Sequence, residues 1–333
     1  MTTTTETIAP PRRTVGARAL DILGRYGVLI FLLLLIAVFS ILLPGRFFTA
    51  ANGVTILTGQ AIPLILAIAV LFPLSAGEFD LSVAANLSFC GVWVAYSSSL
   101  GWPVVLVLVS ALAIGAIIGA VNAFFIVKVG VNAFIATLAM GTILVGFNLL
   151  VTNGQLLFRG IPDELKKIGT TTFIGFPMTV WIAFALALVV WYILEFTPFG
   201  RYIRATGSGR EAARLSGVRT GPSLAAVFII AGTISGLAGF LNTAWIGSAN
   251  PTSGPEFLLP AYAAAFLGAT VIQPGLFNLW GTIIGALVLA VGISGLVIAG
   301  APFWLPNVFN GVALLIAVSL SVLSARKRGD STR

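Results

Sequence analysis

The feature that most constrains this chain is a series of long apolar runs almost free of charge. Several reach the roughly 20 residues that a helix needs to cross the hydrocarbon core of a bilayer. Because the runs are continuously apolar and do not alternate with polar residues, they favour spanning helices over barrel strands. The sequence therefore predicts an all-α, polytopic membrane protein with about ten transmembrane helices. The candidate spans are residues 25–43, 53–75, 79–99, 102–125, 132–152, 176–196, 222–245, 256–273, 277–299 and 304–323.

The distribution of Lys and Arg predicts the orientation of these spans. An even number of spans places both ends on one side, and most of the basic residues fall on that side. They are Arg12, Arg13, Arg18, Lys128, the five arginines between residues 198 and 223, Arg326, Lys327, Arg328 and Arg333. Only Arg46, Arg159, Lys166 and Lys167 fall opposite. Since Lys and Arg near span ends gather in the cytoplasm, both termini are predicted to be cytoplasmic.

This topology divides the chain into three parts. We expect a cytoplasmic tail over residues 1–24, a transmembrane domain over 25–323 and a second cytoplasmic tail over 324–333. Within the transmembrane domain, residues 197–221 are expected to form a long cytoplasmic loop.

The inventory of reactive residues excludes many enzymes. The chain has no histidine and a single cysteine, Cys90, so it has no imidazole base, no common zinc site and no internal disulfide. It also lacks a G-x-x-x-x-G-K-[ST] phosphate loop and a G-x-S-x-G nucleophile motif. Its basic residues lie between apolar spans, where they fix orientation, so nucleic-acid binding is not expected. We therefore expect no catalysis, metal or cofactor in this chain.

Two pairs of similar segments suggest an internal repeat. GAIIGA at residues 115–120 is echoed by GTIIGA at 281–286, and the Glu-Phe pair at Glu78 is echoed at Glu256. In the predicted topology each pair lies on spans of opposite direction, as in inverted-topology repeats. Small residues at this spacing also recur in membrane helices simply because they allow close packing. The residues leave both interpretations open.

The segment PFGRYIRATGSGREAARLSGVRTGPS, residues 198–223, holds five of the 18 basic residues. Ser208 followed three residues later by Glu211 predicts a capping box, and Gly217 supplies a stop signal. A short cytoplasmic helix is therefore expected over residues 209–216.

One face of this expected helix is small and apolar. Ala212 and Leu215 lie three residues apart, which suits a groove in a second protein. The alternative is a charged loop that only fixes the topology. The pattern by itself does not choose between them.

Three segments carry a family resemblance. GRYIRATGSGREAARLSGV, GEFDLSVAANLSF and WGTIIGALVLAVGISGL resemble the ribose-type permease subunits of bacterial ABC importers for sugars, over residues 22 to 323. The resemblance implies a subunit of the bacterial inner membrane that translocates a monosaccharide or polyol. It also implies a cytoplasmic ATPase that binds ATP and Mg, an extracytoplasmic sugar-binding protein, and a second permease copy or homologous permease subunit.

The resemblance implies that the arginine-rich loop is the coupling segment, which seats in a cleft of the cytoplasmic ATPase. Carried over to this sequence, the contact residues are Gly207, Arg210, Glu211, Ala212, Ala213, Arg214, Leu215 and Gly217.

Two segments depart from the family pattern. A Gly-Gly-Ile-Asp-Leu-Ser type of segment is replaced here by residues 77–82, GEFDLS, and a glycine-rich turn by residues 273–277. The first departure lies near the expected translocation path, so the identity of the substrate stays open.

The candidate residues of the substrate path are carboxylates, amides, hydroxyls and an aromatic ring. Intramembrane carboxylates are costly and usually functional, and a sugar is bound through amides, hydroxyls and aromatic faces. The candidates are Glu78, Phe79, Asp80, Ser82, Asn86, Asn122, Asn132 and Thr137, with Trp93, Asn148 and Asn242 considered beside them. Alternatively, the acids lie in a hydrated interfacial turn, with Asp80 capping a helix that begins near Leu81, and the amides bond neighbouring helices.

Glu256 begins the eighth span on the outer face. It is expected either to contact the binding protein or to stabilise the N-terminus of its own helix. The rival functions are an ion-coupled secondary transporter, in which Glu78 and Asp80 bind the cation or proton, a membrane-embedded enzyme, and a channel.

Overall fold

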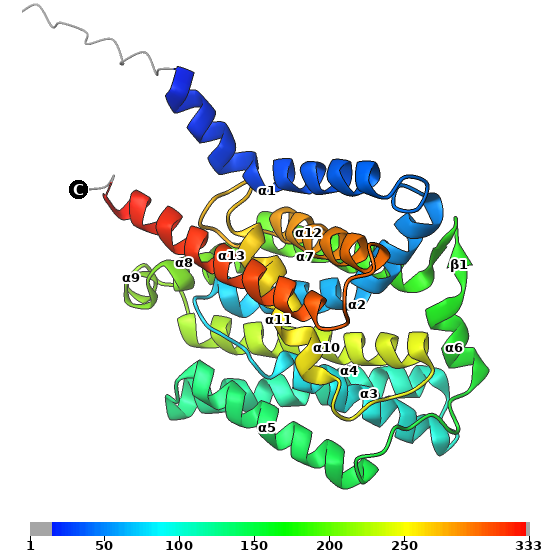
Figure 1. The fold of residues 1–333 in the computed structure, drawn as a ribbon. Coiled ribbons are helices and arrows are strands. Elements are labelled where there is room, and N and C mark those ends of the chain that lie inside the picture. Colours follow the sequence, from blue (N-terminus) through cyan, green and yellow to red (C-terminus); the bar gives the residue numbers. More distant parts are fainter. Residues whose placement is uncertain (1–14, 331–333) are drawn as a thin grey trace, which may run out of the picture.

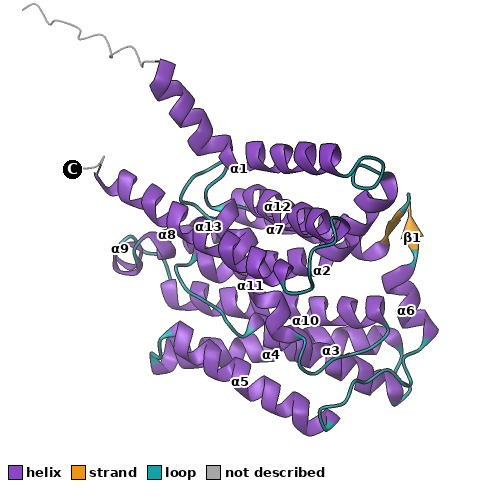
Figure 2. Cartoon of the chain, in the orientation of Figure 1, coloured by secondary structure: helices purple, strands orange, loops and turns teal. Residues whose placement is uncertain are grey.

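The computed structural model describes the backbone of residues 15–330 and the side chains of residues 26–319. The regular structure is almost entirely helical (Figures 1 and 2). The α-helices are α1 (Val15–Leu42), α2 (Ala50–Ser75), α3 (Val83–Ser99), α4 (Val104–Ala123), α5 (Ala133–Thr152), α6 (Asp163–Thr170), α7 (Met178–Phe196), α8 (Pro198–Ser208), α9 (Arg210–Leu215), α10 (Thr220–Ile246), α11 (Gly254–Gly268), α12 (Leu279–Ile298) and α13 (Leu305–Asp330). A π-helix, η1 (Phe124–Val129), continues α4, and β1 (Thr172–Phe173) pairs with β2 (Phe176–Pro177) in an antiparallel hairpin.

Each of the ten predicted spans corresponds to a helix. Within the described residues, six helices are long and apolar enough to cross a membrane: α2, α4 with η1, α5, α7, α10 and α12. The predicted tails at residues 1–14 and 331–333 lie outside the described residues, whereas residues 15–24 and 324–330 extend α1 and α13.

The predicted eighth span is too long at its C-terminal end. Its helix, α11, ends at Gly268 and does not reach residue 273. Beyond it the chain turns through Ile272 and Gly275, whose φ angles of 63° and 81° no α-helix accommodates. The predicted third span is likewise too long at its N-terminal end, because α3 begins at Val83 and not at residue 79. α3 and α11 are thus both short, with 17 and 15 residues.

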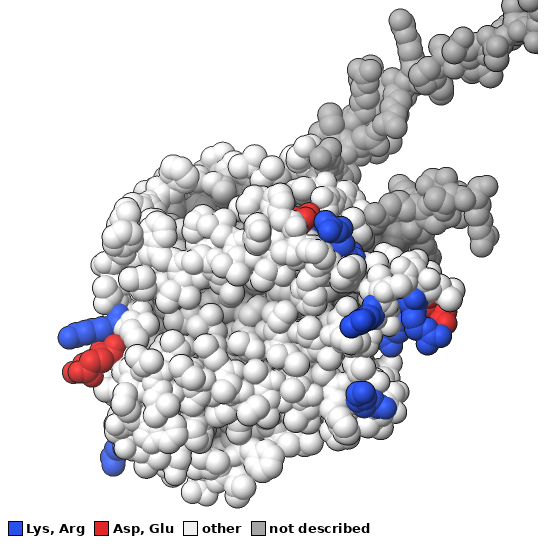
Figure 3. Space-filling model, turned by 180° about the vertical axis from the view of Figure 1, so that it is seen from behind, with Lys and Arg blue, Asp and Glu red and all other residues white. Residues whose placement is uncertain are grey.

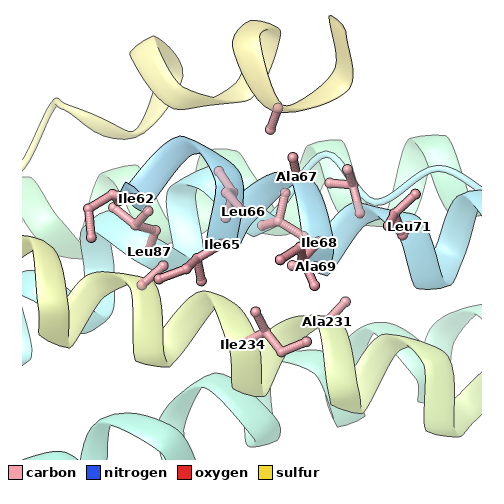
Figure 4. Close-up of a cluster of buried hydrophobic side chains, with 14 of the residues drawn as sticks. Ile62, Ile65, Leu66, Ala67, Ile68, Ala69, Leu71, Leu87, Ala231 and Ile234 are labelled. Atoms are coloured by element: carbon pink, nitrogen blue, oxygen red, sulfur yellow. The ribbon is translucent and has the colours of Figure 1, made fainter. Parts of the chain in front are cut away.

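α2 forms the centre of the core. Every residue from Ile65 to Phe72 has 0% exposure, and the helix is apolar on all sides. An apolar helix in a membrane protein can face either lipid or other helices, and the burial of residues 65–72 shows that this part of α2 is surrounded by other helices. Figure 4 shows its side chains meeting Leu87 of α3 and Ala231 and Ile234 of α10.

Glycines bring two pairs of helices into backbone contact. A Cβ atom at Gly115 of α4 would overlap the carbonyl oxygen of Gly232 in α10, and one at Gly281 of α12 would overlap that of Gly268 in α11. Both echoed G-x-x-x-G-like segments therefore serve close helix packing.

The helix contacts fall into two similar sets. α3 packs on α4 and α5, as α11 packs on α12 and α13. In the same way α10 contacts α3 and α4, as α2 contacts α11 and α12. These contacts pair the α2–α5 segment with the α10–α13 segment.

On the face drawn in Figure 3, the charged side chains of the described residues gather at two opposite ends, with an uncharged region between them. α8 and α9 lie at one end, and α6 lies at the other (Figure 1). The first described residues of α1 and the last of α13 lie at the α8–α9 end. A belt without charge between two charged ends is the surface that a bilayer requires.

Candidate functional site

The arginine-rich segment folds into two helices, α8 and α9. The prediction of a capping box was wrong, because Ser208 is the last residue of α8 and its hydroxyl donates to the carbonyl oxygen of Arg204 at 2.9 Å. The N-cap of α9 is Gly209, without a side-chain hydrogen bond. The predicted stop is confirmed: Gly217 has φ 86° and its N–H donates to the carbonyl of Arg214.

α9 presents apolar side chains to its surroundings. Leu215 is 81% exposed and Ala212 is also exposed, whereas Ala213 is buried against the protein. Arg214 forms an ion pair with Glu211 at 3.1 Å within the helix. α9 therefore offers an apolar surface flanked by charges.

The α8–α9 segment touches the loop between α2 and α3 at two points. Gly77 and Gly207 meet backbone to backbone, and a Cβ atom at Gly207 would overlap the carbonyl oxygen of Ser75. Beside them, the Arg210 guanidinium lies 2.5 Å from Oε1 of Glu78. Burial of Glu78 raises the pKa of its carboxyl group above the ordinary value, and Arg210 opposes that shift.

The next residues of this loop are held inside the helix bundle. Asp80 is 1% exposed, and its Oδ1 accepts hydrogen bonds from the backbone N–H of Ser82 at 3.0 Å and from its hydroxyl at 2.6 Å. Nδ2 of Asn122 donates to the hydroxyl of Ser82 at 2.8 Å. Asp80 thus closes a turn just before α3, which begins at Val83, and does not cap a helix starting at Leu81.

Side chains from two other helices satisfy the backbone of the same loop. The hydroxyl of Tyr262 in α11 accepts from the N–H of Asp80 at 3.0 Å and donates to its carbonyl at 2.9 Å. The N–H of Leu81 donates to the hydroxyl of Thr137 in α5 at 3.0 Å. Irregular backbone inside a membrane protein requires such partners, since no water is at hand.

Phe79 lies between these two anchored parts of the loop. Its ring is 40% exposed and stacks on Tyr262 and Phe266, with centroid distances of 6.0 and 6.3 Å. Phe79 is the only one of the predicted aromatic candidates in this loop, and it remains accessible from outside the chain.

The other predicted path residues lie apart from this loop. Asn86 is 1% exposed and its Nδ2 lies 3.4 Å from the carbonyl of Gly115. Asn132 is exposed and caps α5 through the N–H of Phe134 at 3.0 Å. Asn148 donates to the carbonyl of Pro251, and the ring N–H of Trp93 donates to the hydroxyl of Ser110. Asn242 is buried.

A second irregular loop, residues 247–253, is held in a similar way. The hydroxyl of Ser88 donates to the carbonyls of Asn250 and Pro251, and Nδ2 of Asn148 donates to Pro251 at 3.1 Å. Sequence reasoning missed Tyr262 and Ser88. The only sequence signal for either residue was that it places a polar group inside a short apolar run.

Glu256 lies exposed in the first turn of α11, where its charge favours the helix N-terminus. Among the residues that the structure describes, no group of three or more Cys, Asp or Glu side chains could hold a metal ion.

A groove of about 250 Å³ opens between α3, α5 and α11, directly after the α2–α3 loop. Its lining is mostly apolar, with one hydroxyl. The lining residues are Leu81, Ala84, Ala85, Leu138, Gly141, Thr142, Val145, Pro255 and Leu258.

Comparison with known proteins gives consistent matches over most of the chain. The model of a family described as the permease component of branched-chain amino acid transport systems matches residues 52–318. The ribose import permease of Haemophilus influenzae is 34% identical over 292 residues, which cover 87% of this chain and 90% of that protein. The ribose import permease of Escherichia coli K12 is 36% identical over 293 residues, covering 87% and 91%.

A more distant relative is the D-allose transport system permease of Escherichia coli K12, 28% identical over 303 residues, which cover 91% of this chain and 93% of that protein. No solved structure matches the chain. Together with the six helices that are long and apolar enough to cross a membrane, these matches identify a multi-pass protein of the bacterial inner membrane. The chain belongs to the family of permease components of branched-chain amino acid transport systems, and the ribose import permeases are its relatives.

Proposed function

We propose that this chain is the translocation subunit of an ABC importer and that its cargo is a sugar, either a monosaccharide or a polyol. The relatives named for ribose and allose import support this cargo class. The observation that carries the proposal is the projecting helix α9, whose Leu215 is 81% exposed at the charged end of the molecule. Such an exposed apolar side chain suits a protein partner.

That partner is a cytoplasmic ABC ATPase, which binds the ATP and Mg that this chain does not. α9 docks in a cleft of the ATPase, and the cytoplasmic loop at residues 197–221 carries it. The docking residues are Gly207, Arg210, Glu211, Ala212, Ala213, Arg214, Leu215 and Gly217. Closure of the ATPases pushes on α9 and biases the bundle between inward-facing and outward-facing states.

The proposed topology has ten crossings with both termini in the cytoplasm. α3 and α11 are short because an irregular loop precedes each of them inside the bundle. The paired helix contacts support an inverted repeat that matches α2–α5 with α10–α13. The transmembrane domain then occupies residues 25–323, between cytoplasmic tails at 1–24 and 324–333.

A second permease copy or a homologous subunit completes the path. The groove between α3, α5 and α11 supports this arrangement, since it is open in the single chain and is lined by Leu81, two residues after Phe79. The candidate path residues remain Glu78, Phe79, Asp80, Ser82, Asn86, Asn122, Asn132 and Thr137. Phe79 is exposed here, whereas the buried amides meet cargo only after the helices move.

A sugar-binding protein delivers the cargo at the opposite end. Glu256 is the proposed contact, because it is exposed at the start of α11 and forms no ion pair among the described residues. The same charge also favours its own helix N-terminus.

The test is affinity purification of this chain from its native membranes in mild detergent, followed by mass spectrometry. We expect an ABC ATPase and a sugar-binding protein to co-purify, and a ligand screen of that binding protein names the cargo. Recovery of neither partner contradicts the proposal. Uptake that survives ATP depletion and fails with an uncoupler would instead identify an ion-coupled transporter.

A further inference from the structure

The α2–α3 loop is anchored on both sides of one exposed residue. On the N-terminal side, Glu78 is bound to Arg210 at the start of α9. On the C-terminal side, Asp80 is bound to Tyr262 through both of its backbone groups. Phe79 lies between them, so its position depends on the relative placement of α9 and α11.

The contact between Glu78 and Arg210 is unlike the other described ion pairs of this region. Arg204 pairs with Glu195, which joins α8 to α7, and Arg214 pairs with Glu211 inside α9. Only the pair at Glu78 joins the arginine-rich segment to the α2–α3 loop within the described residues. The Glu78 side chain is 22% exposed and the Arg210 side chain is 50% exposed, so water screens part of their attraction.

We infer that Glu78 is a positioning residue, and that its ion pair with Arg210 makes the loop and the ring of Phe79 follow the movement of α9. The backbone contact of Gly77 with Gly207 resists a push from α8, and the ion pair resists a pull. Asp80 is hydrogen-bonded to α11 and Leu81 to α5, so these two residues stay in place when α9 moves. Phe79 is therefore the residue that is displaced. This inference rests on the proposed function, since an ATPase is needed to move α9.

The experiment follows the chemical reactivity of a thiol at the position of Phe79. Phe79→Cys is made in a Cys90→Ala background and purified with its ATPase in mild detergent. Its rate of reaction with N-ethylmaleimide is compared without nucleotide and with ATP plus vanadate. We expect nucleotide to change the rate about fivefold or more, as for an ordinary coupling between sites. An unchanged rate, in a complex that hydrolyses ATP, overturns the inference.

Variants of the ion pair separate a positioning role from a general loss of stability. In Glu78→Gln, the ratio of the reaction rates with and without nucleotide is expected to be close to one. Glu78→Asp keeps the charge and is expected to retain most of the nucleotide effect. The matched control is Glu195→Gln, which removes an ion pair of α7 and α8 and leaves the nucleotide effect unchanged. If Glu78→Gln keeps the full effect, the inference is wrong.

A double-mutant cycle with Arg210→Gln tests whether the two residues act as a unit. The nucleotide effect on the reaction rate is expected to be the same in the double variant as in Glu78→Gln alone. If the two substitutions instead reduce the nucleotide effect additively, the pairing is contradicted. If Arg210→Gln releases the ATPase, the cycle cannot be measured. The comparison of Glu78→Gln with Glu78→Asp then tests whether the charge of Glu78 is needed for the nucleotide effect. Co-purification of the ATPase with the parent protein is scored separately, so failure of the proposed function is distinguished from failure of this inference.

Discussion

The hydroxyl group of Tyr262 bonds both the N–H and the carbonyl of Asp80, a residue 182 positions earlier in the chain. This one side chain therefore provides hydrogen-bond partners for two backbone groups of an irregular loop that lies away from water. It also stacks against the ring of Phe79 at 6.0 Å. The position of the α2–α3 loop thus depends on a helix from the other half of the chain.

Replacing Tyr262 with Phe is expected to destabilise the protein by about 1–3 kcal/mol, because two buried backbone groups of Asp80 lose their partner. The measurement is thermal unfolding of the purified protein in detergent. Tyr192→Phe is the control, since Tyr192 is 60% exposed. Equal stability of the two variants would show that another group replaces the missing hydroxyl.

Replacing Gly207 with Val is expected to disrupt the contact of α8 with the α2–α3 loop, because a Cβ atom there overlaps the carbonyl oxygen of Ser75. Overpacking of this kind costs about 1–3 kcal/mol. Stability in detergent and yield in the membrane fraction report the loss. Gly146→Ala in α5 meets no neighbour within 4 Å and should be neutral or slightly stabilising. A harmless Gly207→Val would mean that α8 is not pressed against the loop.

Replacing Leu215 with Asp places a charge on the apolar surface of α9. If α9 docks in an ATPase, binding should weaken by about 2 kcal/mol or more, roughly thirtyfold, as for an anchor residue of an interface. Pull-down of the ATPase from membranes measures it. Leu156→Asp, at an exposed position between α5 and α6, should leave binding intact. Undiminished binding of the Leu215 variant would exclude α9 as the docking site.

The thiol of Ala212→Cys tests which end of the molecule is cytoplasmic. A membrane-impermeant maleimide should label it in inverted vesicles and not in intact spheroplasts, because α9 is proposed to face the cytoplasm. The native Cys90 is buried and should not react. Lys167→Cys, in α6 at the opposite end, should show the reverse pattern. Labelling of the Ala212 variant from outside would invert the proposed topology.

Stability should respond to pH through Glu78. Burial raises the pKa of this carboxyl group in the folded state above its ordinary value of 4.5, so the folded protein binds the proton more readily than the unfolded chain. As the pH falls through the raised pKa toward 4.5, the wild-type protein should gain stability relative to Glu78→Gln. Denaturation of both proteins over this range checks the sign. A relative loss would show that the attraction of Arg210 outweighs burial.

The arginine-rich segment shows how far local sequence reasoning reached. The helix α9 and its stop at Gly217 followed from local signals and are confirmed. The prediction of a capping box at Ser208 was wrong, because α8 includes Ser208 and the Ser208 hydroxyl donates to the carbonyl oxygen of Arg204. Whether a serine caps the helix after it or ends the one before it depends on the tertiary contacts of α8.

The sequence by itself determined that this chain is a bundle of apolar helices with charged ends. Apolar run length and the placement of Lys and Arg are local properties, and the cost of exposing polar groups to lipid leaves few alternatives to helices. The packing segments GAIIGA and GTIIGA are likewise readable, since close contacts between membrane helices require small residues.

Only the tertiary structure decided which polar residues meet. The side chains of Tyr262 and Thr137 reach the α2–α3 loop from distant parts of the sequence, and Arg210 reaches Glu78 across 132 positions. No periodicity records such partners, because any exposed or buried polar group is compatible with the same apolar pattern. The pairing arises when the helices pack and the irregular backbone must find hydrogen bonds within the protein.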